Sequence, residues 1–235
     1  MGIFTSEFVG TALLILLGNG VVANVVLKNT KGNNSGWIVI TFGWAMAVFV
    51  GVFATAKTSG AHLNPAITFA FAYLGKVGSE TIPQYLGGQM LGAMAGQLFV
   101  YLTYRQHYLA TEDTVSKLAS FSTIPQIRGY AGNFLTEGIA TFAFVLAVLF
   151  IVAPANSLGA IDALPVAFVV LAVGLSLGGP TGYAINPARD LGPRIMHAIL
   201  PIGKKGITDW AYSWVPVMAP IVGGLLAAIV FKQLR

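Results

Sequence analysis

Long apolar stretches separated by short polar connections run along the whole chain. A transmembrane helix needs about 20 predominantly apolar residues, and six stretches reach or approach that length. The pattern therefore predicts an all-α membrane protein with six spans, of which the fifth is the shortest. The six predicted spans are Ile3–Leu27, Trp37–Ala56, Pro83–Tyr104, Ala131–Ala153, Ala163–Gly178 and Trp210–Phe231.

Two further apolar runs, Pro65–Leu74 and Pro187–Leu200, are too short to cross a bilayer. Each begins with proline and follows an asparagine, Asn64 or Asn186. Asparagine is a favoured N-cap and proline fits the first helical position, so each run is predicted to be a short helix. At ~1.5 Å per residue such a helix reaches ~15–20 Å, roughly half of a ~30 Å hydrocarbon core. Runs of this length are either re-entrant half-helices or amphipathic surface helices.

An internal repeat favours the re-entrant alternative. Glu7 and Glu137 open the first and fourth spans, and an Asn-Pro-Ala triplet follows the second and the fifth. Each half contributes three crossings, and an odd number inverts the second half relative to the first. The half-helices therefore enter from opposite faces, and their Asn-Pro ends meet near the midplane, where non-helical backbone lines a cavity or is buried in protein. The predicted organisation is one domain, residues 1–235, with inverted repeats over approximately 1–105 and 130–235 joined by residues 105–130.

The composition narrows the class of protein further. Hydrophobic residues make up 56% of the chain and charged residues 9%, whereas soluble domains carry about 25% charged residues. The chain has no cysteine, which excludes disulfides and thiolate metal sites. The net charge of +5 is spread over the connections and forms no basic stripe, so no nucleic-acid partner is expected. The spans hold no nucleophile–base or metal-binding constellation, so neither an enzyme nor a cofactor or metal is expected.

The two repeated motifs resemble those of the aquaporin family, and the match extends over essentially the whole chain. They are Ser59–Ala66, which reads Ser-Gly-Ala-His-Leu-Asn-Pro-Ala, and Asn186–Arg194, which reads Asn-Pro-Ala-Arg-Asp-Leu-Gly-Pro-Arg. Asp190, Arg194 and Pro216 are similar to the glycerol-facilitator branch. The resemblance implies an aquaporin-like fold with six transmembrane helices and two re-entrant half-helices in an inverted repeat.

The resemblance also implies a function and a setting. The function is a passive channel for glycerol and similar small uncharged solutes, with some water, that excludes ions and protons. The setting is a homotetramer in the lipid bilayer of a bacterial plasma membrane, with several spans per subunit and both termini cytoplasmic. The charge pattern opposes this orientation, because it leaves more Lys and Arg outside than inside, against the positive-inside rule. The alternatives are a water-dominant or broad neutral-solute pore and, from another class, an ion-coupled transporter.

The pore is expected to be lined by the Asn-Pro ends and the segments that lead to them. Asn64 and Asn186 are expected to cap the half-helices through their side-chain oxygens and to leave their amide N–H groups free for a permeant at the central constriction. Each helix N-terminus carries roughly half a positive elementary charge, which opposes cations, hydronium included. The approach segments are expected to be extended, with their unpaired backbone carbonyls forming a ladder of acceptors at Gly60, Ala61, His62, Gly182, Ala184 and Ile185.

The residues of the selectivity filter follow from the resemblance. Arg189 is expected to project into the lumen, opposite the aromatic rings of Trp44 and Tyr183, so that the filter has one polar edge and two apolar walls. Gly174 stands where water-selective members carry histidine, and it is expected to widen the constriction. Tyr183 stands where glycerol facilitators commonly carry phenylalanine, so its hydroxyl adds polarity and leaves the balance of glycerol against water open.

Three acidic residues are expected to support the pore. Following the resemblance, Glu7 and Glu137 each accept backbone N–H bonds from the pore loop of their own half, and Asp190 anchors a helix end and a loop. Hydrogen bonds to a charged group contribute about 1.5–3 kcal/mol each. We therefore expect loss of either glutamate to impair assembly more than selectivity.

Overall fold

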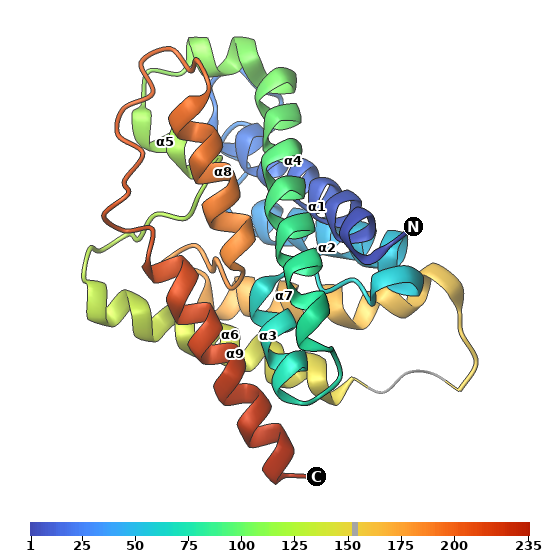
Figure 1. Ribbon diagram of the computed structural model, residues 1–235. Helices are drawn as coiled ribbons and strands as arrows, with labels where there is room; N and C mark the ends of the chain where they lie inside the picture. The colour runs from blue at the N-terminus through green and yellow to red at the C-terminus, as the bar shows by residue number, and fades with distance from the viewer. Residues whose placement is uncertain (152–154) are drawn as a thin grey trace.

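The computed structural model describes residues 1–151 and 155–235, and this part of the chain is helical, with no strand in it. The predicted all-α fold is therefore confirmed (Figure 1). The last two residues of the predicted span Ala131–Ala153 lie outside the described residues. The α-helices are α1 (Ile3–Val26), α2 (Trp37–Ser59), α3 (Pro65–Tyr73), α4 (Ile82–Ala110), α5 (Thr114–Ala119), α6 (Tyr130–Phe150), α7 (Leu164–Leu177), α8 (Pro187–Ile199) and α9 (Val215–Gln233), and the 3₁₀ turns are η1 (Ser79–Thr81) and η2 (Gly159–Ala163).

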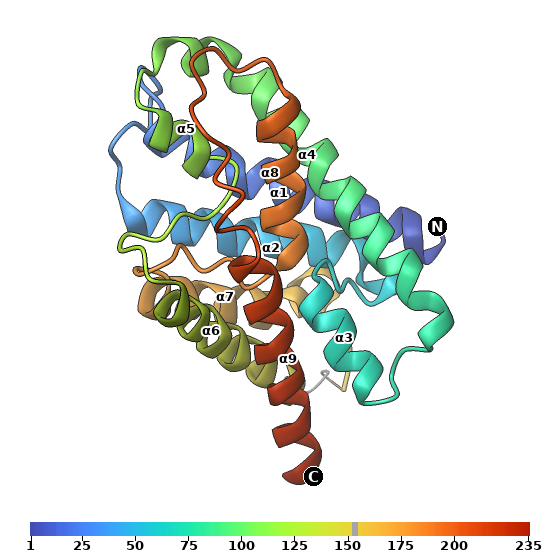
Figure 2. The same ribbon diagram turned by 60° about the vertical axis from the view of Figure 1, so that its left-hand side comes forward.

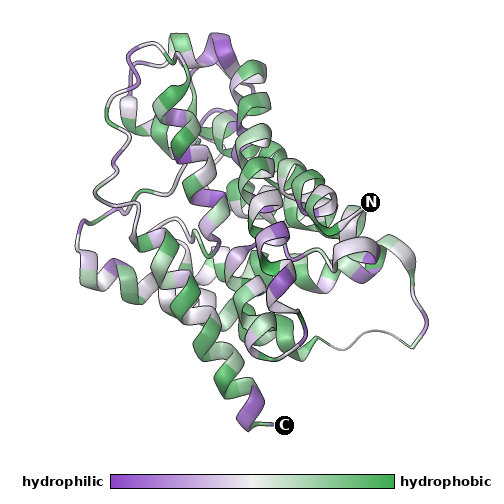
Figure 3. Ribbon diagram, viewed as in Figure 1, coloured by the Kyte–Doolittle hydropathy of each residue, from purple (hydrophilic) through white to green (hydrophobic). Residues whose placement is uncertain are grey.

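Six long helices match the six predicted spans. Five of them are long and apolar enough to cross a membrane on length and composition alone, namely α1, α2, α6, α9 and the segment Gly159–Leu177 that joins η2 to α7. The sixth is α4, which has 29 residues but a more polar sequence. Its residues Gln89 and Gln97 are fully buried and hydrogen-bonded inside the protein. Their polarity is therefore buried inside the protein, and Figure 3 shows hydrophilic positions within α4, along α8 and at helix ends.

The two halves of the chain pack in the same way. In the first half α1 lies against α2 and α4, and in the second half α6 lies against α7 and α9. Each half-helix also contacts a long helix of the other half, because α3 packs on α9 and α8 packs on α4 (Figure 2). This exchange brings the N-termini of α3 and α8 together in the middle of the molecule.

Glycines set the closeness of the main helix crossings. A Cβ atom added at Gly88, Gly92 or Gly96 of α4 would lie 2.4–2.5 Å from a carbonyl oxygen of α1. In the second half, a Cβ atom at Gly223 of α9 would lie 2.3 Å from the carbonyl oxygen of Gly138 on α6. Helices in lipid associate through such close packing of small residues. The glycine-rich third and sixth spans are therefore the points at which each half is held together.

The start of the last helix differs from the prediction. Helix α9 begins at Val215, whereas the apolar pattern indicated Trp210. The preceding residues form turns, and the buried Arg194 side chain donates hydrogen bonds to the carbonyls of Thr208 at 2.9 Å and Asp209 at 3.2 Å. The apolar pattern could not predict this later start, because the hydrogen bonds that hold residues 208 and 209 in turns come from Arg194 on another helix.

The connection between the halves contains a helix that the sequence pattern did not indicate. Helix α5 has six residues, too few for a hydrophobic period to be visible. Its N-cap is Asp113, whose carboxylate accepts hydrogen bonds from the backbone N–H groups of Val115 and Ser116, both at 3.1 Å. The half-helices α3 and α8, by contrast, begin at the predicted residues.

Candidate functional site

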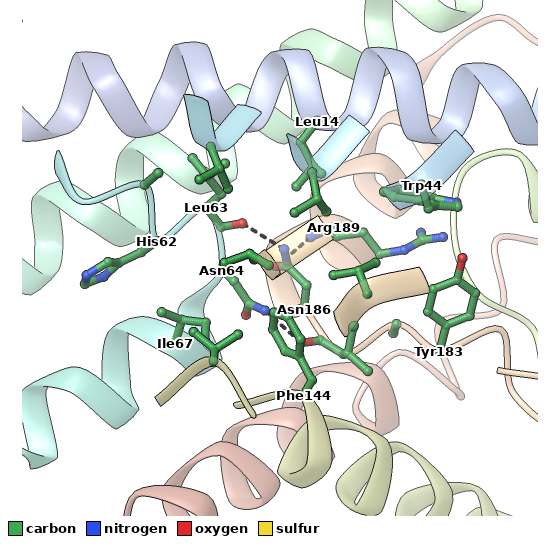
Figure 4. A pocket seen from close by; sticks show the side chains of 18 of the residues that line it. Leu14, Trp44, His62, Leu63, Asn64, Ile67, Phe144, Tyr183, Asn186 and Arg189 are labelled. Atoms are coloured by element: carbon green, nitrogen blue, oxygen red, sulfur yellow. Dashed lines mark hydrogen bonds between the residues drawn. The ribbon is translucent and has the colours of Figure 1, made fainter. Parts of the chain in front are cut away.

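A cavity lies where the N-termini of α3 and α8 meet (Figure 4). Its polar groups come from Asn64, Asn186, Arg189 and the backbone of the two approach segments. Its apolar side chains come from both halves of the chain. They are Leu14 of α1, Val48 and Val52 of α2, Ile67 and Phe71 of α3, Phe144 and Val148 of α6, and Val166 and Val170 of α7.

The two asparagines cap the half-helices and also join them to each other. Asn64 Oδ1 accepts from the backbone N–H of Ala66 at 2.9 Å, and Asn186 Oδ1 accepts from those of Ala188 and Arg189 at 3.1 and 3.2 Å. Each carboxamide nitrogen also donates a hydrogen bond to a carbonyl of the opposite approach segment. Both asparagines line the cavity.

The cross-links change the expectation that the asparagine amides are free. Asn64 Nδ2 donates to the carbonyl of Ile185, and Asn186 Nδ2 donates to the carbonyl of Leu63, both at 2.8 Å (Figure 4). A carboxamide carries two N–H hydrogens, so one hydrogen of each asparagine remains for a permeant. The same bond locks the two half-helices in register.

The approach segments are not extended throughout, which corrects the sequence-based expectation in part. Alternate residues have positive φ, at 50° for Ala61, 51° for Leu63, 39° for Tyr183 and 44° for Ile185. Left-handed backbone costs about 1–2 kcal/mol for residues with a side chain, and a β-branched residue such as Ile185 is a clear outlier there. Strain of this size persists only where the surroundings hold the backbone firmly.

Glu7 holds the first approach segment. Its two carboxylate oxygens accept from the backbone N–H of His62 at 3.0 Å and from that of Leu63 at 2.7 Å. The Ser59 hydroxyl and the Gln89 amide add donors at 2.6 and 2.8 Å. The side chain is completely buried. Successive backbone N–H groups around a left-handed residue form a concave anion site, and here the anion is the carboxylate of Glu7.

Glu137 holds the second approach segment in the equivalent way. Its carboxylate accepts from the backbone N–H groups of Ala184 and Ile185, both at 3.0 Å. The position that corresponds to Gln89 in the repeat is Pro220, which has no donor. The two halves therefore share the backbone bonds and differ in the side chains that surround the carboxylate.

These carboxylates also orient the carbonyls of the approach segments. A peptide unit is planar and trans, so the carbonyl of one residue points away from the N–H of the next. The backbone N–H bonds to Glu7 and Glu137 thus turn the carbonyls of Ala61, His62, Tyr183 and Ala184 away from the glutamates. The Tyr183 carbonyl therefore shares the orientation of the predicted ladder carbonyls, and the carbonyl of Ile185 already accepts a bond from Asn64.

Two of the predicted ladder residues have other duties. Gly60 has φ of 79° and is the C-cap residue of α2. The next residue, Ala61, donates its backbone N–H to the Ser59 hydroxyl at 3.1 Å. Gly182 has φ of 86° and donates to the carbonyl of Gly178 at 2.8 Å. Gly60 lines the cavity, and Gly182 is not among the lining residues.

His62 packs beneath the first approach segment and also contacts the cavity. Its ring stacks on Tyr85 with centroids 4.2 Å apart and meets Phe71 edge-on at 5.0 Å. Its Nδ1 lies 3.1 Å from the hydroxyl oxygen of Thr68. The ring is therefore fixed on three sides, in keeping with a packing role.

Arg189 lies at one end of the cavity with its guanidinium against Trp44. The Cζ atom is 4.3 Å from the centroid of the Trp44 ring, a distance at which a desolvated cation and an aromatic face attract each other by ~2 kcal/mol. Nη1 reaches the carbonyl of Phe121 at 3.5 Å. The Trp44 ring has its place because Gly18 leaves room, since a Cβ atom there would lie 2.3 Å from the ring.

Phe121 is a contact of Arg189 that the sequence did not indicate. It belongs to the connection between the halves, and its carbonyl also accepts from Asn19 Nδ2 on α1 at 2.9 Å. Asn19 Nδ2 in turn donates to Gln97 on α4 at 2.6 Å. No motif marks Phe121, because the group that contacts the arginine is a backbone carbonyl.

Tyr183 fills the space that Gly174 was expected to leave open. A Cβ atom at Gly174 would lie 2.9 Å from Tyr183 Cζ and 3.0 Å from a methyl carbon of Thr41. Trp37, a second residue that the sequence did not indicate, meets the Tyr183 ring edge-on at 5.7 Å and donates through Nε1 to the Gly174 carbonyl at 3.1 Å. Gly174 is not among the residues that line the cavity. It therefore makes room for the tyrosine ring and does not widen the passage.

Asp190 ties α8 to the loop beyond α5. Its carboxylate forms a fully buried ion pair with Arg194, with Oδ1 2.9 Å from Nε and 2.8 Å from Nη2. Its other oxygen accepts from the backbone N–H and the hydroxyl of Thr123, both at 2.7 Å. Arg194 Nη2 returns a bond to the Thr123 carbonyl at 3.0 Å. The pair thus positions the loop that carries the Phe121 carbonyl.

Comparison with known proteins identifies the family. The model of the major intrinsic protein family matches residues 1–231. The chain is 53% identical over 235 residues to a probable glycerol uptake facilitator protein of Thermotoga maritima, covering 100% of both chains. It is 51% identical over 226 residues to a glycerol uptake facilitator protein of Streptococcus pneumoniae, covering 96% of each.

A solved structure agrees with the sequence comparisons. The X-ray structure of the aquaglyceroporin from Plasmodium falciparum matches with a TM-score of 0.87 at 32% identity, covering 98% of this chain and 95% of that one. The fold, the inverted pair of half-helices and the sequence matches over the whole chain lead to one conclusion. The chain belongs to the major intrinsic protein family and is a membrane channel, not an enzyme.

Proposed function

We propose that the protein is a passive channel for glycerol and similar small uncharged polyols, with some passage of water, that excludes ions and protons. The observation that carries the proposal is the cavity at Asn64 and Asn186, which is lined by apolar side chains together with the asparagines, Arg189 and the backbone of the approach segments. The names of the similar proteins, glycerol uptake facilitators among them, support glycerol as the permeant.

The central part of the proposed pore opposes cations. Helices α3 and α8 point their N-termini at the cavity, and each terminus carries roughly half a positive charge. The remaining amide hydrogens of Asn64 and Asn186 donate to a permeant oxygen at this point. An oxygen held by two donors cannot at the same time accept from the next molecule in the file, so a proton wire is interrupted there.

The carbonyls turned toward the cavity receive the permeant's hydroxyl hydrogens. A polyol hydroxyl donates and accepts, so it exchanges its hydration for carbonyls and asparagine amides at small net cost. The apolar side chains that line the cavity suit the carbon backbone of the polyol. A solute without hydroxyl groups desolvates the same carbonyls and asparagine amides but forms no hydrogen bonds with them, so its passage is unfavourable.

The proposed selectivity filter consists of Arg189, Trp44 and Tyr183, with Gly174 behind the tyrosine ring. The guanidinium is planar and presents fixed donors, which suit two adjacent hydroxyl groups. Its charge also repels cations at the mouth of the pore. Trp44 and Tyr183 supply the apolar surfaces on which the carbon chain of a polyol lies.

We further propose the organisation and orientation implied by the family. The chain forms one channel domain with inverted repeats over approximately 1–105 and 130–235, assembles as a homotetramer, and keeps both termini in the cytoplasm. Three connections share one face, because the backbone N–H of Lys28 donates to Thr111 Oγ1 at 2.9 Å and Lys117 Nζ reaches the Lys204 carbonyl at 3.3 Å. This arrangement supports an even number of crossings with those three connections on the same side of the membrane, which we propose is the outer side.

The test is stopped-flow light scattering on proteoliposomes. Vesicles are first shrunk by an impermeant solute, which reports water flux, and then by glycerol, which reports glycerol entry as reswelling. Reswelling in glycerol well above that of protein-free vesicles, with no ion gradient present, supports the proposal. Fast water flux without protein-dependent glycerol entry would instead indicate a water-dominant pore.

A further inference from the structure

The Tyr183 hydroxyl is a polar group that the pore leaves without a partner. Tyr183 lines the cavity and is 5% exposed. Within residues 1–151 and 155–235, its hydroxyl oxygen is buried and has no hydrogen-bond partner. Figure 4 shows the hydroxyl on the same side of the ring as the Arg189 guanidinium and the Trp44 ring. A solute that enters between these side chains would supply the partner that the buried hydroxyl lacks.

The ring cannot turn its hydroxyl away from the filter. The Tyr183 ring packs closely against Gly174 and Gly178. A Cβ atom added at Gly174 would lie 2.9 Å from a ring carbon, and one added at Gly178 would lie 2.4 Å from another. Trp37 closes the remaining side in an edge-on contact at 5.7 Å and is itself fixed by its bond to the Gly174 carbonyl. A phenylalanine ring would occupy the same seat and would differ only in lacking the oxygen.

We propose that the Tyr183 hydroxyl is a specificity-determining group that pairs with a hydroxyl of the permeant, so that the pore distinguishes three-carbon alcohols of similar size by their number of hydroxyl groups. This inference rests on the proposed polyol channel. Tyr183 and Arg189 together offer three or more hydrogen-bonding positions to a solute in the filter, which glycerol can occupy with its three hydroxyls. Propane-1,2-diol places a methyl group where glycerol has a hydroxyl.

A site built to bond a hydroxyl rejects the analogue that lacks it, because its own polar group is then left unpaired. A filter with an apolar ring at this position has no such preference. The ratio of glycerol to propane-1,2-diol permeability therefore falls about fivefold or more when the tyrosine hydroxyl is removed. A methyl and a hydroxyl group are close in size, so this ratio reports hydrogen bonding and is insensitive to a general widening of the filter.

The experiment compares Tyr183→Phe with the parent protein in proteoliposomes, using glycerol, propane-1,2-diol and water as the three permeants. Fluxes of protein-free vesicles are subtracted for each solute. Tyr104→Phe is the matched control, because it deletes the same hydroxyl from α4 at a residue that does not line the cavity. We expect the glycerol-to-diol ratio to fall in Tyr183→Phe and to stay at the parent value in Tyr104→Phe.

The outcomes separate this inference from the proposed function. If Tyr183→Phe conducts glycerol and keeps the parent ratio, the inference is wrong and the glycerol channel stands. A parent protein with no glycerol flux above protein-free vesicles overturns the proposed function itself. Loss of both water and glycerol flux in Tyr183→Phe, with Tyr104→Phe normal, also contradicts the inference, because deleting one oxygen from a seated ring leaves the passage open.

Discussion

Replacing Glu7 with alanine tests whether the buried carboxylates hold the strained pore loops. The substitution removes the acceptor of two buried backbone donors, the N–H groups of His62 and Leu63. A buried donor without a partner costs about 1–3 kcal/mol, so these two donors alone destabilise the protein by about 2–6 kcal/mol. Ser59 and Gln89 can turn toward other acceptors and are left out of this figure. The total stability of a domain is about 5–15 kcal/mol, so the effect is large.

The assay is thermal unfolding of the purified protein in detergent, followed by the fluorescence of its four tryptophans and by size-exclusion chromatography. Glu112→Ala is the control, because Glu112 is exposed. Glu137→Ala removes the acceptor of Ala184 and Ile185 and is expected to have an effect of the same order, somewhat smaller because fewer side chains surround its carboxylate.

The same variants distinguish a structural role from a role in selectivity. Protein that survives the Glu7→Ala change is expected to keep the parent ratio of glycerol to water flux. The groups that Glu7 bonds, on Ser59, His62, Leu63 and Gln89, are not part of the proposed selectivity filter. An unfolding midpoint equal to that of Glu112→Ala, together with parent-like glycerol flux, would refute the reasoning.

Three further predictions concern other parts of the fold. Arg194→Met leaves the Asp190 carboxylate buried without its cation, which costs about 3–5 kcal/mol. The thermal unfolding midpoint of this variant should therefore fall sharply, and a parent-like midpoint would argue against a structural role for the ion pair. Gly92→Ala places a Cβ atom 2.4 Å from an α1 carbonyl oxygen and should destabilise the protein by about 1–3 kcal/mol. Gly20→Ala is the control, because no atom lies within 4 Å of the added Cβ. Equal unfolding midpoints for the two variants would contradict the close packing of α1 against α4. The hydroxyl of Ser116 and the first N–H groups of α5 hold the pKa of Asp113 below the ordinary value of an aspartate. The cap therefore stabilises the protein above about pH 4, the ordinary range of an aspartate, and this stabilisation is lost as the pH falls through the lowered pKa. The stability difference between the parent and Asp113→Ala, about 0.5–2 kcal/mol near neutral pH, should shrink in acid, and a constant difference would contradict the reasoning.

The elements that local chemistry determines could be predicted from the sequence. The start of each half-helix follows from an asparagine cap and a proline in the first turn, and α3 and α8 begin where these residues place them. The apolar lengths of the long spans are equally local. The inverted repeat follows from counting three spans in each half, because an odd number of crossings fixes the direction of the second half.

The contacts between distant segments could not be predicted, because they depend on how the helices meet. The bond from Asn64 to the Ile185 carbonyl joins residues 121 apart in the sequence, and nothing near either residue indicates it. Likewise, the sequence alone indicates that Gly174 leaves open space, whereas in the structure the ring of Tyr183 packs against it. The conformations of the two approach segments are held by Glu7 and Glu137 from other helices, so the local sequence does not reveal their left-handed residues.

The chemistry of the site divides in the same way. A charged residue is energetically costly to place inside a membrane, so Arg189 indicates a functional position from its residue type alone. The Phe121 carbonyl that Arg189 contacts gives no such signal, since every residue has a carbonyl. Backbone groups become part of a site only through the fold that aims them.

The central claim is that polyols cross through this protein while protons do not. The most direct measurement records both fluxes on one preparation of proteoliposomes, glycerol entry by light scattering and proton entry by an enclosed pH-sensitive dye, with valinomycin and potassium present to remove any limiting voltage. The account predicts glycerol entry far above that of protein-free vesicles and a proton leak equal to theirs. Glycerol entry that requires or carries protons, or a proton leak that rises with the amount of protein, would contradict it.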